Sequence, residues 1–196
     1  WRSGGLVAVS TLVYGKVERV VIEGLDAKDR VVVRTVNTSG EDITLFTPLW
    51  AKAPAPAAAR AMVRRLMDDE QAFARPFGVP ALPASPSSAR PETREQQEAD
   101  GLAMSVHLPW NNLIGEGLLA YGFRDEAARL TIRLMNAVVR SLKEQAAFYE
   151  RYHALTGAAM GERGSLAGAT PVGLFLKTLG VEILSPGNVR LEGMNP

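Results

Sequence analysis

Residues 111–147 read NNLIGEGLLAYGFRDEAARLTIRLMNAVVRSLKEQAA, and this stretch decides the fold class. Apolar residues recur every three or four positions on both sides of Gly122, which is the spacing of one helical face. Glycine readily adopts the positive φ that ends a helix, and two helices joined so closely pack antiparallel. The sequence therefore predicts a hairpin of helices at about 111–121 and 125–147. The expected apolar stripe of the second helix is Ala127, Leu130, Leu134, Met135, Val138, Val139, Leu142 and Ala146.

Helical periodicity continues outside this hairpin. The residues from Pro56 to Leu66 place their apolar side chains on one face, and proline is tolerated in the first turn of a helix. A shorter helix is expected at about 170–179. After it, residues 181–184 and 189–191 flank a Ser-Pro-Gly-Asn turn, which predicts a small hairpin.

The first 50 residues have a different pattern, because they are rich in β-branched side chains and turn sequences. A β-hairpin is expected between about 30–36 and 42–47, across an Asn-Thr-Ser-Gly turn. Five prolines and a polar run predict a surface loop over 76–100. We therefore predict a mainly α fold, with a β-rich segment at 1–50 and a helical domain at 51–196.

The composition argues against several functions. Of the 196 residues, 46% are hydrophobic and 22% are charged, and the formal net charge is +1. So balanced a charge argues against nucleic acid and against an anionic membrane as partners, and no apolar run is long enough to span a bilayer. Cysteine is absent and the two histidines, His107 and His153, lie far apart, so neither a metal site nor a cofactor is expected. No signal peptide is visible, which favours the cytoplasm and leaves the localisation open.

Residues 148–157, FYERYHALTG, carry the first candidate site. Glu150 is flanked by Tyr149 and Tyr152 near the expected end of the long helix. In a partly dry, aromatic pocket a carboxyl group binds its proton more tightly, as general acid or base catalysis requires, and aromatic rings also stack on sugars. The alternative is that the tyrosines pack at the helix end while Glu150 faces water.

A second candidate cluster is HLPWNN, residues 107–112. In the functional interpretation, Trp110 is a platform for a sugar ring, Asn111 binds a substrate hydroxyl and His107 lies beside them. In the structural interpretation, Asn111 or Asn112 caps the helix that begins here, and Trp110 covers the edge of the core.

The order of these motifs resembles the C-terminal part of the (α/α)6-barrel glycosidases, the clan of glycoside hydrolase family 63, the mannosylglycerate hydrolases and debranching-enzyme-like proteins. The resemblance covers about residues 45–196. PFGVP at 76–80 is similar to the family's Tyr-Gly-Ile-Pro loop, and residues 107–122 are similar to its Trp-Pro-x-x-Asn helix. FYERYHALTG resembles its Tyr-Glu-Asn-Tyr-Asp-Pro-x-Thr-Gly motif.

This resemblance implies antiparallel helical hairpins that form part of an (α/α)6 toroid. It also implies an inverting hydrolase of α-linked glucosides or mannosides, in which Glu150 is the general base that activates a water. The expected partner is an oligosaccharide or a small glycoside. The residues expected to bind this substrate are His107, Trp110, Asn111, Tyr149 and Tyr152.

The second carboxyl group of the mechanism has no counterpart that we can place in this sequence. Inverting chemistry needs two carboxyl groups about 6.5–9.5 Å apart, and in relatives the acid is an aspartate far upstream. We expect the chain to be a piece of a longer protein in which the rest of the same polypeptide supplies the acid. The chain alone should then be inactive.

Departures from the family pattern leave the specificity and two rival functions open. His107 and Leu102 stand where relatives have tryptophan, and His153-Ala154 stands where Asp-Pro is common. One rival is a toroid polysaccharide lyase, which would use tyrosine and histidine to remove a proton. The other is a non-catalytic helical module that binds carbohydrate or serves as a scaffold.

Overall fold

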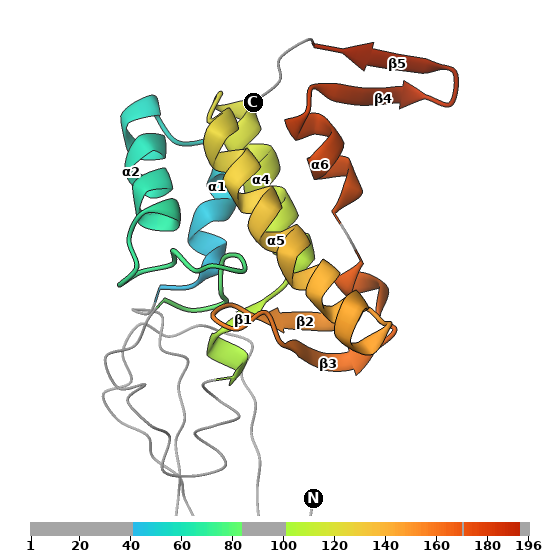
Figure 1. Cartoon of the computed structure of the whole chain (residues 1–196). Coiled ribbons are helices and arrows are strands. Elements are labelled where there is room, and N and C mark those ends of the chain that lie inside the picture. The colour runs from blue at the N-terminus through green and yellow to red at the C-terminus, as the bar shows by residue number, and fades with distance from the viewer. Residues whose placement is uncertain (1–40, 84–100, 170, 193–196) are drawn as a thin grey trace, which may run out of the picture. The chain divides into compact units, whose positions relative to one another are not determined.

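The computed structural model describes residues 41–83, 101–169 and 171–192, all within one compact unit (Figure 1). Helices make up about half of these residues, and the strands form two small antiparallel sheets. The elements in chain order are η1 (Ile43–Phe46), α1 (Thr47–Trp50), α2 (Pro56–Met67), β1 (Ser105–Val106), α4 (Leu108–Ala120), α5 (Arg124–Gln145), β2 (Tyr149–His153), β3 (Ala159–Arg163), η2 (Leu166–Gly168), α6 (Val172–Thr178), β4 (Val181–Ser185) and β5 (Asn188–Leu191).

The helical hairpin predicted from residues 111–147 is confirmed as α4 and α5, which pack side by side (Figure 1). Gly122 has φ +80° in the short turn between them. The predicted stripe of α5 is correct as far as Val138, but Val139, Leu142 and Ala146 are exposed. A helix of 3.6 residues per turn drifts along its length, so the buried face continues from Val138 to Ser141 instead.

The start of α4 differs from the prediction. The helix begins at Leu108 instead of Asn111, because Pro109 lies in the first turn, where a missing N–H costs nothing. His107 is the extended N-cap residue, with φ −94° and ψ 114°. Asn111 therefore lies inside the helix, fully buried, and does not cap it.

The strand predicted at 42–47 is wrong, because these residues form η1 and the start of α1. The side chain of Asp42 caps η1, with its Oδ1 accepting the Thr44 N–H at 2.8 Å. Pro48 lies in the first turn of α1, where its fixed φ suits a helix. The other half of that predicted hairpin lies outside the described residues, so the division of the chain near residue 50 stays a prediction.

A single apolar core joins these helices. The helix predicted from Pro56 is confirmed as α2, and it buries Ala59, Val63 and Leu66. Phe46 and Phe73 meet edge to face, with their ring centroids 4.9 Å apart. The largest buried side chains are Tyr152, Phe46, Phe73, Leu49, Leu66, Met67, Ile114, Leu118, Leu130, Leu134, Leu174 and Val79.

The two sheets lie toward opposite ends of the α4–α5 hairpin (Figure 1). The sheet β1–β2–β3 lies where α4 begins and α5 ends, and the sequence did not predict it. The β4–β5 hairpin and α6, which precedes it, are as predicted. No helix among the described residues is long and apolar enough to cross a membrane. The helical hairpin is thus established, and its membership of a complete toroid stays a prediction.

Candidate functional site

The loop at 76–80 and the start of α4 are tied together by one buried side chain, Asn111. Its Oδ1 accepts the backbone N–H of Val79 at 2.8 Å. Its Nδ2 donates to the carbonyls of Val79 and His107, each at 3.0 Å. Asn111 has no exposed surface, so its observed contacts are with the backbone of the site and none of its surface is open to a ligand.

The same loop is joined to the segment that carries Glu150. The backbone N–H of Phe77 donates to the Ala154 carbonyl at 3.1 Å. The ring of Phe77 packs on Gly157, where an added Cβ would lie 2.7 Å from the ring. Gly157 also has φ +68°, which a glycine adopts without strain. The three stretches singled out in the sequence thus meet at one end of the helical hairpin.

Glu150 itself lies in the central strand β2, and not in a connection after the helix as predicted. Tyr149 pairs with Arg163 and Arg151 with Met160, so β3 carries one extra residue opposite Glu150. That bulge contains Gly161, with φ +77°. An added Cβ on Gly161 would lie 2.5 Å from Oε2 of Glu150, so a larger residue there would move the carboxylate from this position.

The carboxylate is held by polar groups and keeps access to solvent. Its Oε2 accepts the backbone N–H of Glu162 at 3.3 Å. Its Oε1 lies 3.5 Å from Nε of Arg151, and the Glu150 side chain is 37% exposed. The carboxylate is therefore oriented by a strand bulge and a guanidinium, and water can reach it.

Two further residues make the site polar. Arg151 has a largely buried side chain, and its Nε has no hydrogen bond among the described residues. Burial lowers the pKa of His107; repulsion from Arg151 lowers it further, and Glu150 acts in the opposite direction. His107, Glu150 and Arg151 therefore lie close enough to act on one another's charge. In these contacts, the groups that act on the Glu150 carboxylate are a guanidinium and an imidazole.

The two tyrosines beside Glu150 have different environments. Tyr152 is fully buried; its hydroxyl donates to the Gly168 carbonyl at 2.8 Å and receives the Tyr149 N–H at 3.3 Å. Burial raises the pKa of Tyr152, which suits a hydroxyl that stays protonated in the core. Tyr149 is partly exposed. A substrate at the surface can therefore reach Tyr149, and Tyr152 supports the strand beneath it.

Trp110 lies in the first turn of α4 and is 41% exposed. It is on the same turn as Asn111, and its indole makes no hydrogen bond to Glu150 in the described structure. Sequence reasoning also missed Arg151 and Gly161. Arg151 was visible as an arginine where the family motif has asparagine, whereas the role of Gly161 depends on a strand pairing that the sequence did not predict.

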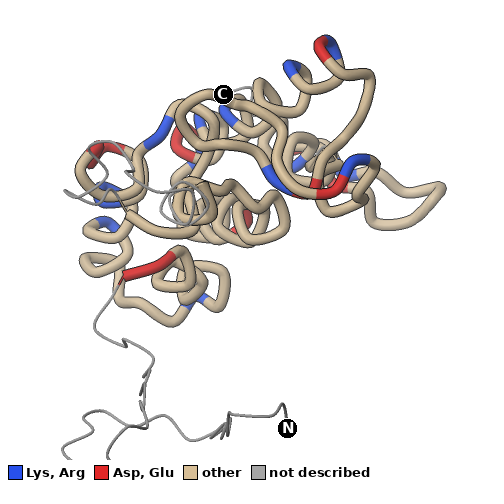
Figure 2. Tube along the Cα trace, turned by 90° about the horizontal axis from the view of Figure 1, so that it is seen from below, with Lys and Arg blue, Asp and Glu red and all other residues tan. Residues whose placement is uncertain are grey.

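Along the described trace, Figure 2 shows Lys and Arg interspersed with Asp and Glu. The described residues contain no group of three or more His, Asp or Glu side chains that could hold a metal ion. The candidate site is thus a single carboxylate with basic and aromatic neighbours.

Comparison with known proteins gives a family and a fold. A family model described as Trehalase matches residues 28–173. No curated protein matches the chain. The GH63 mannosylglycerate hydrolase of Thermus thermophilus in complex with glucose superposes with a TM-score of 0.52 at 21% identity, covering 71% of this chain and 32% of that chain.

Two further solved structures superpose in the same way. In complex with Tris, the same hydrolase has a TM-score of 0.52 at 21% identity, over 71% of this chain and 30% of that chain. An uncharacterized conserved protein of Thermus thermophilus has a TM-score of 0.50 at 22% identity, over 71% and 32%. The chain therefore has the fold of a part of these proteins and spans less than a third of their length.

Proposed function

Since this chain belongs to the trehalase family, we propose that it carries the general base of an inverting glycoside hydrolase. The substrate class is an α-linked glucoside or mannoside, either an oligosaccharide or a small glycoside. The observation that carries the proposal is the position of Glu150, a solvent-accessible carboxylate oriented by Gly161 and by the Glu162 N–H.

In the proposed step, the Glu150 carboxylate takes a proton from a water molecule. The oxygen of that water attacks the anomeric carbon from the face opposite the leaving group, and the glycosidic C–O bond breaks. An acid on the other side of the sugar protonates the departing oxygen, so the product has the inverted configuration. We place that acid outside this chain, in the rest of the same polypeptide.

Three of the expected substrate-binding residues have surface from which to contact a sugar. Trp110 and Tyr149 offer aromatic faces, and His107 lies within electrostatic reach of Glu150. Asn111 and Tyr152 are proposed to act beneath this surface, by holding the loop at 76–80 and strand β2 in place. The glucose bound in the mannosylglycerate hydrolase of similar fold supports a sugar as the ligand class.

The two rival functions receive less support. A lyase needs a tyrosine that gives up its proton, and Tyr152 is unsuited to this because burial raises its pKa and its hydroxyl donates to the Gly168 carbonyl, which leaves Tyr149 and His153 for that role. A non-catalytic module has no need of an accessible, oriented carboxylate, so the environment of Glu150 favours the hydrolase over this rival.

The proposal is tested by replacing Glu150 with glutamine in the native protein. Glu150→Gln keeps the size and removes the base, so kcat on an α-glucoside or α-mannoside should fall roughly 100-fold or more. Glu144→Gln is the matched control, because Glu144 is also a half-exposed glutamate paired with an arginine, Arg140, at 2.9 Å. A Glu150→Gln protein with the kcat of the control would show that the site is not catalytic.

A further inference from the structure

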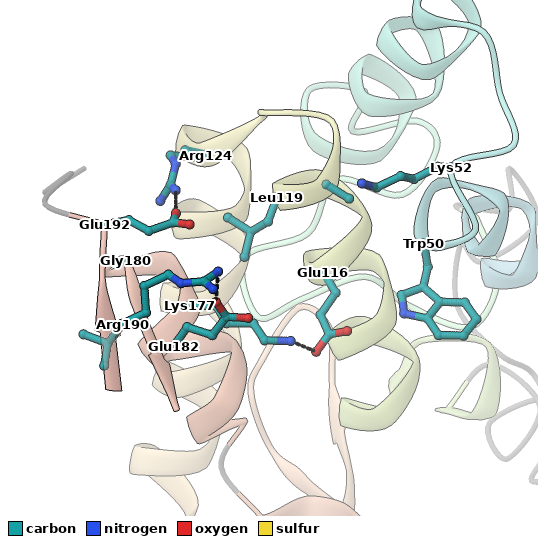
Figure 3. Close-up of a pocket in the computed structure, with 12 residues that line it drawn as sticks. Trp50, Lys52, Glu116, Leu119, Arg124, Lys177, Gly180, Glu182, Arg190 and Glu192 are labelled. Atoms are coloured by element: carbon teal, nitrogen blue, oxygen red, sulfur yellow. Dashed lines mark hydrogen bonds and ion pairs between the residues drawn. The ribbon is translucent and has the colours of Figure 1, made fainter. Parts of the chain in front are cut away.

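A cavity lies at the other end of the helical hairpin, away from Glu150 (Figure 3). Its volume is about 520 Å³, within the range of small-molecule pockets. It is lined by α1, the turn after it, α4, the start of α5, α6 and the β4–β5 hairpin. Neither Glu150 nor any other predicted substrate-binding residue borders it.

An aromatic side chain stands at the edge of this pocket. Trp50 ends α1 and is 52% exposed, and Figure 3 shows its indole among the side chains that line the pocket. The backbone that carries Trp50 is held by close packing of α1 on α4, because an added Cβ on Gly117 would lie 2.7 Å from the backbone nitrogen of Trp50. The indole is thus an exposed flat surface on a rigid support, as a platform for a sugar ring requires.

Beside the tryptophan, a lysine lies in a backbone conformation that L-residues rarely adopt. Lys52 has φ +53°. The backbone N–H of Lys52 donates to the Leu49 carbonyl, and the Tyr121 hydroxyl donates to the Pro54 carbonyl at 2.6 Å, so the chain on both sides of Lys52 is tied to its surroundings. Glycine would fit this position without strain. Lys52 places a positive charge at the pocket from this tied backbone.

Among the charged side chains that line the pocket, Lys52 is the one without an oppositely charged partner within the described ranges. Each acidic lining residue pairs with a basic one: Glu116 with Lys177 at 2.9 Å, Glu182 with Arg190 at 3.0 Å and Glu192 with Arg124 at 2.7 Å. Arg124 is paired with Glu192, and its Nη1 is buried without a hydrogen-bond partner among the described residues. The pocket is therefore electropositive in the direction of Lys52.

We propose that this pocket binds an anionic saccharide, a sugar ring that bears a phosphate or a carboxylate. The ring stacks on Trp50, and the anionic group lies against Lys52. Paired side chains such as Glu116 and Lys177 offer hydrogen bonds to the hydroxyl groups. The site is separate from the proposed hydrolase centre, so this binding proposal does not depend on the role of Glu150.

This proposal is tested by calorimetric titration of the native protein. The four probes are glucose 6-phosphate, glucuronate, glucose and inorganic phosphate. At least one anionic sugar should bind about 10-fold or more tightly than both glucose and phosphate. The sugar that does so identifies the anionic group. Trp50→Ala and Lys52→Gly should each weaken its binding by roughly 10-fold or more.

The Lys52→Gly variant separates binding from folding, because glycine relieves the left-handed strain and its thermal midpoint should not fall. Lys143→Ala, at an exposed lysine of α5, is the charge-matched control and should bind as the unchanged protein does. Equal binding of glucose and both anionic sugars would overturn the proposal. So would an affinity that Trp50→Ala and Lys52→Gly leave intact, since binding would then take place elsewhere.

Discussion

Glu150 and Tyr152 are two positions apart on one strand but lie in different environments. In a regular strand, residues at i and i+2 share a face. The extra residue of β3 opposite Glu150 interrupts the pairing, and bulges commonly redirect side chains next to functional sites. Tyr152 is buried in the core, while Glu150 keeps a carboxylate at the surface. The bulge of β3 places Gly161 and the Glu162 N–H against this carboxylate.

His153, at the end of the same strand, should make the stability depend on pH. Burial lowers its pKa from the ordinary 6.5, and its Nδ1 lies 3.3 Å from the Leu155 N–H and 3.4 Å from that of Thr156. Protonation would remove this acceptor. The unfolded chain therefore takes up the proton more readily than the folded one, and the stabilisation present above pH 6.5 is lost as the pH falls through the folded pKa.

Urea unfolding between pH 7.5 and pH 5 measures this effect. The free energy of unfolding should decrease as the pH is lowered, and His153→Asn, which keeps an acceptor but does not titrate, should reduce the decrease. An identical pH dependence in the two proteins would show that His153 does not contribute.

At the scale of elements, Asn111 joins α4 to the loop at 76–80. Asn111→Ala leaves the N–H and the carbonyl of buried Val79 without partners, which should cost at least about 2 kcal/mol in the free energy of unfolding. Asn112→Ala, one position along and partly exposed, is the matched control and should change stability by less than about 0.5 kcal/mol. Chemical denaturation of both variants measures the difference; equal stabilities would contradict a structural role for Asn111.

Elements with their own periodic pattern were predictable from the sequence. The stripes of α2 and α5 and the Ser-Pro-Gly-Asn turn of β4–β5 are local signals, and all three elements are present. The segment at 42–47 has β-branched residues, but the Asp42 cap and Pro48 turn it into helix. Strands β1, β2 and β3 depend on partners distant in the sequence, which no local pattern specifies.

The sequence predicted some residues of the candidate site but not their arrangement. Glu150 was found from its motif, while the bulge that orients it and the pairing with Arg151 required the structure. Asn111 was expected to face a substrate or to cap a helix, and it does neither in the described structure because Pro109 moves the helix start upstream. Local chemistry was visible in the sequence, but side-chain direction was not.

At the scale of the whole molecule, the chain covers 32% of the hydrolase that it resembles in fold. A single carboxylate cannot both activate water and protonate the leaving group. We therefore expect the 196-residue chain alone to hydrolyse an α-glucoside or α-mannoside at less than about one hundredth of the rate of the protein as its source makes it. Circular dichroism of the isolated chain establishes that it is folded, and comparable rates in the two preparations would contradict an acid located outside the chain.

The configuration of the first product tests the central claim, that Glu150 activates a water for inverting hydrolysis, most directly. Proton NMR of the protein as its source makes it, recorded from the first minutes of hydrolysis of an α-glycoside, distinguishes the anomers before they interconvert. The account predicts that the β-anomer forms first. Initial formation of the α-anomer would mean retention through a covalent intermediate, and would contradict the role assigned to Glu150.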